Sequence, residues 1–389
     1  MKITDIRVRL LSYVIPTEKR HRTDFGWNVK HDSIIVQVET DEGVTGVGTA
    51  VGQAESIQSI VEHQLRAALL GEDPTQIERL WLKMYAGSRV DPSLARGYIQ
   101  PIFGRRGDTL CAIAAVDIAL WDIWGQVVGQ PIYKLLGAAR NRIRAYASGG
   151  WAPGAQAGDE LAGYVAKGFN AVKMRAEGRD GFTIDKSIRR IAAAREAIGP
   201  DVELMVDAHA SLDVSTAIQL AKRMEAYNVA WFEEPISPDH HAGLAEVRRA
   251  TSVPIATGEH EFTRFDFLSL LEQRAVDVIQ PDAGIAGGIT EVRRILALAS
   301  AFGVKAAPHN WGSGILFATS LHLVLAAPNC HLLEVGQAPN PLIHEIFVEP
   351  FDLRAGYVYA PDRPGLGFTL RDDLEERFPF APGPTWVYG

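Results

Sequence analysis

Ionisable residues recur between positions 173 and 334 at intervals of 23 to 34 residues, each close to the end of a short apolar segment. Such an interval fits one strand followed by one helix, so these residues are expected to meet at one edge of a parallel sheet. Carboxylates, an imidazole and an amine in one place can hold a cation and move a proton. The set consists of Lys173, Asp207, Glu233, Glu259, Asp282, His309 and Glu334.

Asp207, Glu233 and Glu259 are the carboxylates of three consecutive predicted strands. Converging anions repel, so we expect a cation to hold them together. An all-oxygen ligand set without cysteine favours a single Mg²⁺ over Zn²⁺, with substrate or water in the remaining positions. For any one of the three alone, a solvated or ion-paired carboxylate is the simpler interpretation, so the metal prediction depends on the set.

Asp282 and His309 follow the next two predicted strands, in Gln280-Pro281-Asp282 and Pro308-His309. On adjacent strands, Asp282 can bond one ring nitrogen of His309, fix its tautomer and raise the basicity of the other nitrogen. We therefore predict a catalytic dyad with His309 as the base. For His322 and His344 we expect ordinary structural roles.

Lys173 and Arg175 alternate along one predicted strand, so both side chains point to the same side. Arg175 is a poor base and is expected to bind or orient an anion, whereas Lys173 could neutralise a substrate carboxylate. The alternative is that both form ion pairs with the predicted metal-binding carboxylates.

A proton next to a carboxylate is weakly acidic, because its removal leaves two negative charges on one small anion. A divalent cation on the carboxylate oxygens would stabilise that charge, and Lys173 and a protonated Glu334 would add hydrogen bonds. His309 then needs only ordinary basicity. The residues thus predict an enzyme that removes the proton beside the carboxylate of a small organic acid.

The elements that position these residues are eight short apolar strands, each followed by an amphipathic helix. Eight such units in about 200 residues are typical of an α/β protein with a closed (β/α)-barrel, a modified TIM barrel. The predicted strands cover 143–148, 171–175, 203–207, 230–233, 254–258, 276–280, 305–308 and 331–334.

Two further segments flank the predicted barrel, which we assign to residues 136–335. Residues 1–135 alternate in period two as far as Val51, with a hairpin turn at 41–43, and then turn helical, with a buried helix expected at 112–123. This pattern predicts an α+β N-terminal capping domain. The tail, residues 336–389, loses the strand-helix rhythm and is expected to return to the capping domain.

The composition limits the functional classes. The net charge of −8 argues against a nucleic-acid partner, because phosphate contacts need a basic surface. The N-terminal residues carry charges where a signal peptide would need an apolar run, and no uncharged apolar stretch of membrane-spanning length is evident. The two cysteines, Cys111 and Cys330, are expected to be buried and reduced, which favours a cytoplasmic location.

In this order and on these strands, the motifs resemble the enolase superfamily, and more closely its mandelate racemase and muconate lactonizing enzyme branch. The resemblance covers nearly the whole chain. It implies that Asp207, Glu233 and Glu259 bind Mg²⁺, that Asp282 orients His309, and that Glu334 is an electrophile on the eighth strand. It also implies a small carboxylic acid as substrate and a homo-oligomeric assembly.

One position departs from the racemase-like members, which carry Lys-x-Lys on the second strand. Here the second lysine is replaced by Arg175. With one good base, removal of a proton on one face and its return on the other become difficult, so racemisation is disfavoured. Dehydration does not need the second lysine, since His309 could take the proton and then, as imidazolium, protonate the departing hydroxyl.

The stretch 258–264 is similar to that of rhamnonate-type dehydratases, which favours a polyhydroxy acid. Within it, His260 either donates a hydrogen bond near the metal or only packs beside a ligand, and the same two alternatives hold for His209. Trp311 is expected to shape the pocket wall. Loops 21–27 and 89–106 of the capping domain are expected over the mouth, with His21 a candidate for substrate binding or simply an exposed loop residue.

The sequence therefore predicts a Mg²⁺-dependent hydro-lyase that converts an aldonate or aldarate to a 2-keto-3-deoxy acid. A cycloisomerase or lactone isomerase that expels a ring oxygen is the alternative. A racemase or epimerase is less well supported, and a noncatalytic scaffold would require the regular spacing to be accidental.

Overall fold

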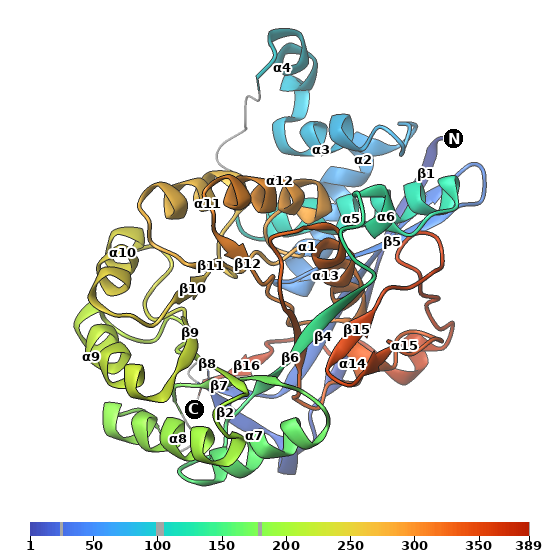
Figure 1. Cartoon of the computed structure of the whole chain (residues 1–389). Helices are drawn as coiled ribbons and strands as arrows, with labels where there is room; N and C mark the ends of the chain where they lie inside the picture. Colours follow the sequence, from blue (N-terminus) through green and yellow to red (C-terminus); the bar gives the residue numbers. More distant parts are fainter. Residues whose placement is uncertain (24–25, 99–104, 178–180, 389) are drawn as a thin grey trace.

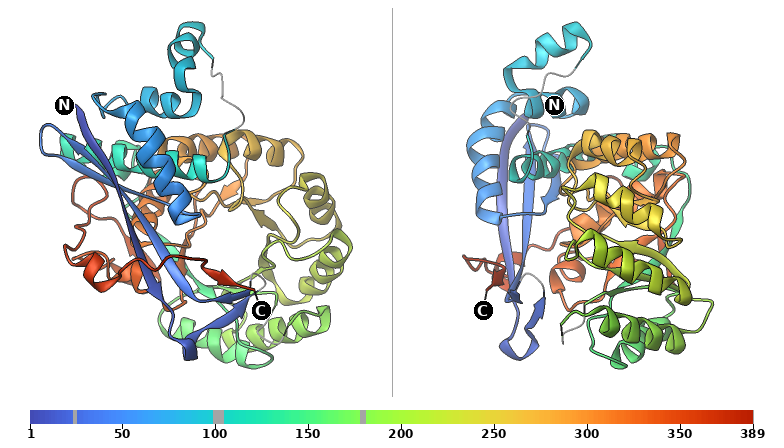
Figure 2. Two further views of the ribbon diagram at one scale, coloured as in Figure 1. Left: turned by 180° about the vertical axis from the view of Figure 1, so that it is seen from behind. Right: turned by 90° about the vertical axis from the view of Figure 1, so that its left-hand side faces the viewer.

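The computed structural model describes residues 1–23, 26–98, 105–177 and 181–388, with only the backbone at 21–23. The chain folds into a barrel covered on one side by a mixed sheet-and-helix domain (Figures 1 and 2). The predicted fold class, an α/β barrel with an N-terminal capping domain, is confirmed.

The capping domain begins with an antiparallel sheet of three strands, β1 (Ile3–Val14), β4 (Lys30–Thr40) and β5 (Thr45–Ala50). The β4–β5 hairpin turns at 41–44, as the period-two pattern predicted. A second small sheet, which the sequence pattern did not reveal, joins β2 (His21–Thr23) and β3 (Gly26–Asn28) to the distant β16 (Trp386–Val387).

Helices follow the sheet, as the change of period predicted. The longest, α5 (Asp108–Val128), lies so close to β5 that a Cβ added at Gly48 would meet the carbonyl oxygen of Ala115 at 1.9 Å. By length and composition alone α5 could cross a membrane, but 78% of its apolar window is buried in the protein, as in a core helix. The others are α1 (Ala54–Ile60), α2 (Arg66–Leu69), α3 (Ile77–Ala86), α4 (Val90–Arg96) and α6 (Ile132–Leu135).

All eight predicted barrel strands are present and parallel to one another. The barrel closes where β13 pairs with β6 and where a bridge joins Ala306 at the end of β12 to Cys330. The strands are β6 (Arg142–Gly149), β7 (Ala171–Arg175), β8 (Glu203–Asp207), β9 (Val229–Glu233), β10 (Ile255–Thr257), β11 (Val278–Ile279), β12 (Lys305–Ala306) and β13 (Leu333–Gly336).

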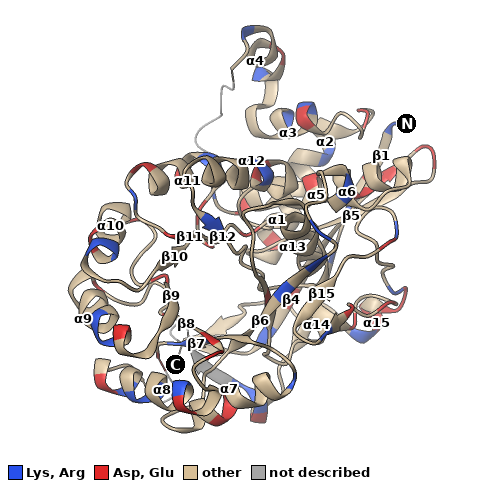
Figure 3. Cartoon of the chain, viewed as in Figure 1, with Lys and Arg blue, Asp and Glu red and all other residues tan. Residues whose placement is uncertain are grey.

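Side chains from every strand fill the barrel, so it is a packed core rather than a pore. Tyr146 and Trp231 meet edge to face there, with ring centroids 5.5 Å apart. In the part of the chain that the structure describes, seven helices surround the barrel, and acidic and basic residues are intermixed on them (Figure 3). They are α7 (Gln156–Ala166), α8 (Ile184–Ile198), α9 (Val214–Met224), α10 (His241–Ala250), α11 (Thr263–Glu272), α12 (Gly288–Ala301) and α13 (Gly314–Ala326).

The tail after β13 returns to the capping domain, as expected. The backbone N–H of Ser12 on β1 donates to the carbonyl of Phe378 at 3.2 Å, and Lys30 on β4 donates to the carbonyl of Ala381 at 2.5 Å. One part of the tail also extends the barrel sheet, because β15 pairs antiparallel with β6. The exact domain boundaries at 135 and 335 stay a prediction. The tail elements before β16 are α14 (Pro341–His344), β14 (Leu353–Arg354), β15 (Tyr357–Tyr359) and α15 (Leu374–Arg377).

Candidate active site

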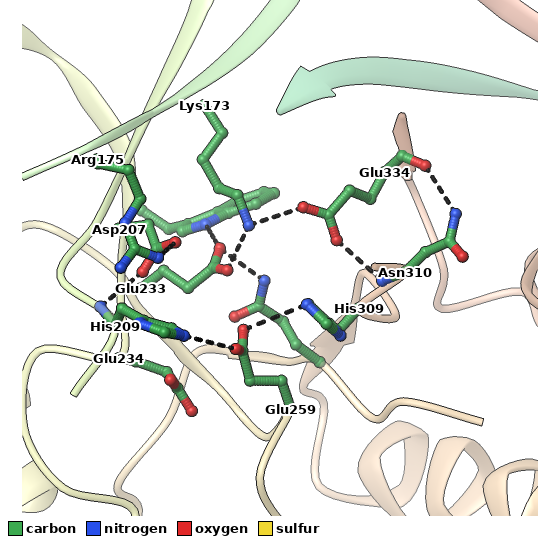
Figure 4. A network of polar contacts seen from close by, with 12 residues as sticks. Lys173, Arg175, Asp207, His209, Glu233, Glu234, Glu259, His309, Asn310 and Glu334 are labelled. Carbon is green, nitrogen blue, oxygen red and sulfur yellow. Dashed lines mark hydrogen bonds and ion pairs between the residues drawn. The ribbon is translucent and has the colours of Figure 1, made fainter. Parts of the chain in front are cut away.

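The carboxyl ends of the barrel strands bring the regularly spaced residues together, and Figure 4 labels all of them except Asp282. Arg175, Asp207 and Glu233 are register partners on the neighbouring strands β7, β8 and β9. Glu259 lies two residues beyond β10, and Asp282 and His309 lie three residues beyond β11 and β12. Residues separated by up to 161 positions in sequence therefore share one mouth.

A cavity of about 260 Å³ lies above this mouth, between the barrel and the capping domain. Its barrel side contains Lys173, Arg175, Asp207, Glu259, His309 and Glu334, all of which were predicted as site residues. Glu233 is fully buried beneath this floor and does not line the cavity. A larger groove of about 910 Å³, between the tail and the barrel, contains none of the predicted site residues.

Lys173 is buried between two glutamates. Its ammonium group bonds the carboxylate of Glu233 and lies 2.9 Å from Oε1 of Glu334. Burial opposes the charge, but the two carboxylates raise the pKa of Lys173 well above its ordinary value. The backbone N–H of Asn310 donates to the other oxygen of Glu334 at 2.9 Å. Lys173 is thus a fixed cation within the site.

The acid form expected for Glu334 is not favoured by these contacts. Burial alone would raise its pKa, yet the charge of Lys173 lowers the pKa of Glu334 below its ordinary value. The carboxylate therefore accepts hydrogen bonds from Lys173 and Asn310, whereas the sequence argument required it to donate one.

Arg175 donates to Asp207 Oδ2 at 2.9 Å, and the backbone N–H of His209 donates to Oδ1 at 2.7 Å. Although burial opposes ionisation, the charges of Arg175 and Lys173 hold the pKa of Asp207 at about 2. Arg175 and Lys173 both contact predicted metal carboxylates, which corresponds to the ion-pair alternative considered from the sequence.

The predicted dyad is present as a short contact. His309 Nδ1 lies 2.7 Å from Asp282 Oδ2, and the backbone N–H of Gly284 donates to the other Asp282 oxygen at 2.7 Å. With Nδ1 as the donor, Nε2 carries the free lone pair and lies 3.7 Å from Glu259 Oε2. Burial opposes a charge on the ring, but Glu259 and Asp282 raise the pKa of His309 well above its ordinary value.

Glu259 is 6% exposed, and no hydrogen bond to its carboxylate is recorded among the described residues. His209 and His260 approach its Oε1, each at 3.9 Å. One ligand atom from each of these three residues lies within 4.8 Å of the other two, a spacing that the predicted set of three carboxylates does not meet within the described chain. Glu259 is therefore common to both possible cation sites.

His260 forms a hydrogen bond with the buried Glu234, whose Oε1 lies 2.8 Å from His260 Nδ1. Burial opposes protonation, but the bond and charge of Glu234 raise the pKa of His260 to about 9. His260 and Trp311 both line the cavity, and their roles stay predictions. The side chain of His21 lies outside the described residues, so its predicted role is not addressed.

His322 is structural, as expected. Its Nδ1 accepts from the backbone N–H of Tyr133 at 3.1 Å and Nε2 donates to the carbonyl of Leu366 at 3.0 Å. Burial lowers the pKa of His322 to about 4. The two cysteines are buried and unpaired, also as expected.

Several cavity residues escaped the sequence argument. Trp151 lies two residues beyond β6, as Glu259 lies two residues beyond β10, so the strand-end rule could have found it. Its ring meets that of Trp311 edge to face, with centroids 5.9 Å apart. Asn28 and His31 lie just beyond the predicted loop 21–27. Trp386 comes from the tail, where no periodic pattern indicated a strand.

A barrel with a lysine, carboxylates and an Asp-His dyad at the carboxyl ends of its strands defines an enzyme that performs acid-base chemistry on a small anion. The chain matches the model of the mandelate racemase and muconate lactonizing enzyme N-terminal domain over residues 6–137, and the model "Enolase C-terminal domain-like" over residues 156–374. The chain belongs to the enolase superfamily, in its mandelate racemase and muconate lactonizing enzyme branch.

Three relatives match almost end to end. An arabinonate dehydratase of Saccharolobus solfataricus is 35% identical, covering 97% of this chain and 99% of the relative. A D-galactarolactone cycloisomerase of Agrobacterium fabrum is 34% identical, and the match covers 97% of this chain and 98% of the relative. A D-galactonate dehydratase of Ralstonia pickettii is 36% identical, covering 91% and 94%.

A solved structure also resembles the chain closely. This racemase from Streptomyces coelicolor, with bound magnesium, has a TM-score of 0.83 and 31% identity, covering 97% of this chain and 98% of that one.

Proposed function

We propose that this protein is a Mg²⁺-dependent dehydratase that converts a sugar acid to a 2-keto-3-deoxy acid. The observation that carries the proposal is the His309–Asp282 pair, 2.7 Å apart, which presents the free ring nitrogen beside Glu259 in a cavity between barrel and cap. The relatives named arabinonate and D-galactonate dehydratase support the same reaction class.

Asp207, Glu233 and Glu259 are the residues that would hold the cation. A carboxylate offers about four lone-pair positions. Glu233 accepts a hydrogen bond from Lys173 on Oε1 and hydrogen bonds from Trp231 and Gln280 on Oε2. One lone-pair position, on Oε1, therefore remains for a cation.

The other two carboxylates retain more capacity for a cation. Each Asp207 oxygen accepts one bond, and Glu259 accepts none among the described residues. A nearly buried carboxylate without hydrogen bonds is costly unless a cation compensates it, so the donor set fits a hard ion. When bound, Mg²⁺ stabilises the negative charge that develops on the substrate carboxylate.

His309 removes the α-proton. Nε2 accepts this proton, and the electron pair of the C–H bond is first delocalised onto the substrate carboxylate. That pair then forms the double bond between the α- and β-carbons as the β C–O bond breaks. The imidazolium gives the proton to the departing hydroxyl, which leaves as water. The enol product then loses the proton of its α-hydroxyl group and takes up a proton at the β-carbon, which gives the keto acid. Because the charge of Glu259 strongly favours the imidazolium, its neutralisation by a cation favours the free base that the first step needs.

Lys173 remains a cation through this cycle, because Glu233 and Glu334 both stabilise its charge. Its ammonium group can donate to the substrate carboxylate while Glu334 and Asn310 keep it in place. Glu334 thus acts through Lys173.

Arg175 makes racemisation unfavourable. It occupies the place of a second basic residue on β7, but its guanidinium is paired with Asp207 and stays protonated. Return of a proton to the opposite face of the substrate then has no base on that strand. This supports dehydration over racemisation.

The second candidate is a cycloisomerase that uses the same proton removal but expels a ring oxygen instead of water. The 34% identity to a D-galactarolactone cycloisomerase favours it specifically. The two reactions differ in mass, since dehydration makes the product lighter by one water and isomerisation leaves the mass unchanged.

The proposal is tested by incubating purified protein and Mg²⁺ with aldonic acids, aldaric acids and their lactones, followed by mass spectrometry. We expect a keto acid lighter by one water from at least one acid, and no product from the His309→Asn variant. A product of unchanged mass from a lactone would establish the cycloisomerase instead. The cytoplasmic location and homo-oligomeric state stay predictions.

A further inference from the structure

The upper wall of the cavity is built from sequence that lies outside the barrel. Strand β16 pairs antiparallel with β3, with Trp386 opposite Asn28, and the backbone N–H of Val29 donates to the carbonyl of Thr385 at 3.1 Å. Trp386 and Asn28 both line the cavity. The wall therefore depends on a strand that the tail adds to the capping domain.

Strand β16 packs tightly against β3. Gly26 has a φ of +112°, and a Cβ built there would lie 2.6 Å from the carbonyl oxygen of Val387. Lys30 fixes the preceding tail segment through its bond to Ala381 and lies 4.9 Å from the ring centroid of Phe380. The backbone that carries Trp386 is therefore held at several points, and the residue lines the cavity.

Asn28 has a side-chain oxygen that accepts no hydrogen bond from the described residues. Its side chain is 3% exposed, and its Oδ1 has no hydrogen-bond partner among the described residues. A buried amide oxygen without a partner is costly, and a ligand hydroxyl is a matching donor. The amide therefore fits the hydroxylated part of a bound sugar acid.

The cationic side chains sit at the opposite side of the cavity. Among its described lining residues, the lysine and arginine side chains are those of Lys173 and Arg175, and both are already paired with carboxylates of the barrel floor. Among the described residues, the upper wall presents Asn28, Trp386 and the ionisable side chain of His31. A second carboxylate placed there would lose water without gaining a lysine or arginine partner.

Resting on the proposed dehydratase function, we infer that Asn28 and Trp386 form a distal subsite that selects an aldonate, a sugar acid with one carboxylate, over an aldarate. The carboxylate and α-carbon of the substrate lie at the barrel floor beside Lys173 and His309. Its hydroxylated end reaches the upper wall, where Asn28 bonds a hydroxyl and the indole covers the C–H surface.

The test compares wild type with the Trp386→Ala and Asn28→Ala variants on aldonate and aldarate pairs of equal carbon number. Assays are run with Mg²⁺ at pH 8. In the wild type we expect kcat/KM to favour the aldonate by at least about tenfold, since an unpaired buried charge costs more than about 1.4 kcal/mol. Each variant is expected to raise KM for the aldonate about five- to tenfold with little change in kcat, because the groups bind away from the reacting carbons.

Tyr388→Ala is the matched control, because Tyr388 is 88% exposed on the same segment and does not line the cavity. Wild-type preference for the aldarate, or Trp386→Ala kinetics equal to those of Tyr388→Ala, would overturn the inference. If no acid of either class is dehydrated, the proposed function fails separately. Aldonate binding by calorimetry then tests the subsite alone, with weaker binding in both variants expected and unchanged binding refuting it.

Discussion

His309 and His209 approach Glu259 from two sides, at 3.7 and 3.9 Å, and both line the cavity. Only proton removal makes the α-hydrogen exchange with solvent, so exchange in D₂O isolates the role of the base. We expect His309→Asn to lower this exchange about 10²- to 10⁴-fold. His209→Asn should retain it, because His309 and Asp282 are intact. NMR of the recovered substrate measures the exchange.

Loss of exchange in His209→Asn with normal exchange in His309→Asn would reverse the assignment. Mg²⁺ affinity should be unchanged in His309→Asn, since His309 is not among the proposed ligands. Calorimetry on the same preparation excludes a variant that has merely misfolded.

Asp207 and His209 provide a second comparison at the scale of single residues, because they distinguish the two possible cation sites around Glu259. If oxygen ligands hold Mg²⁺, Asp207→Asn should weaken binding by about a hundredfold or more, since loss of an outer partner alone costs roughly 10- to 100-fold. His209→Asn should change the affinity little. Titration calorimetry gives both values, and the opposite order would assign the ion to His209, Glu259 and His260.

At this scale, the sequence predicted which residues meet but not how each is bound. Lys173, Asp282 and His309 were found because one strand-helix unit separates such residues, and parallel strands end at one edge. The bond between Glu234 and His260 was not found, because it depends on side-chain directions in two separate loops.

Among the elements, the barrel strands were predictable because each is a short apolar run bounded by turn residues. β3 and β16 were not, since three- and two-residue strands carry too little periodicity and their pairing joins opposite ends of the sequence. Helix α5 was predicted from its apolar run, but its link to α12 was not. Asp117 on α5 accepts from the backbone N–H of Thr290 in the first turn of α12 at 2.9 Å.

That link makes stability depend on pH. Burial raises the pKa of Asp117 from 3.8 to about 7, although the bonds from Thr290 oppose the rise. The folded state therefore keeps a proton that the unfolded chain loses, so the stabilisation is complete below about pH 4 and is lost as pH rises through about 7. Asp117→Asn keeps the neutral form at every pH.

We accordingly expect the free energy of unfolding of Asp117→Asn, relative to wild type, to increase from pH 5 to pH 8. The increase should reach at most about 1.4 kcal/mol per pH unit. Urea denaturation at several pH values measures it. A difference between the two proteins that does not vary with pH would contradict the raised pKa.

Across the whole molecule, Asp122 joins three segments that are distant in sequence. From α5 it accepts the backbone N–H of Val47 on β5 at 3.0 Å and that of Leu366 in the tail at 2.8 Å. Asp122→Ala would remove the partner of the buried N–H of Leu366 and of the part-buried N–H of Val47, so we expect a loss of about 2–4 kcal/mol in the free energy of unfolding. Gln126→Ala, at an exposed position that also bonds Asp122, should cost less than about 1 kcal/mol. Equal urea midpoints for the two variants would show that Asp122 does not act as this junction.

The pairing of β3 with β16 also bears on how the protein acquires activity. Asn28 and Trp386 lie near opposite ends of the sequence, so their meeting closes one of the longest loops in the chain and has a high entropic cost until the barrel and cap are in place. During refolding from denaturant, the helical circular dichroism signal should therefore return before substrate binding does. An early compact intermediate would have the catalytic residues of the barrel in place before β3 and β16 have paired.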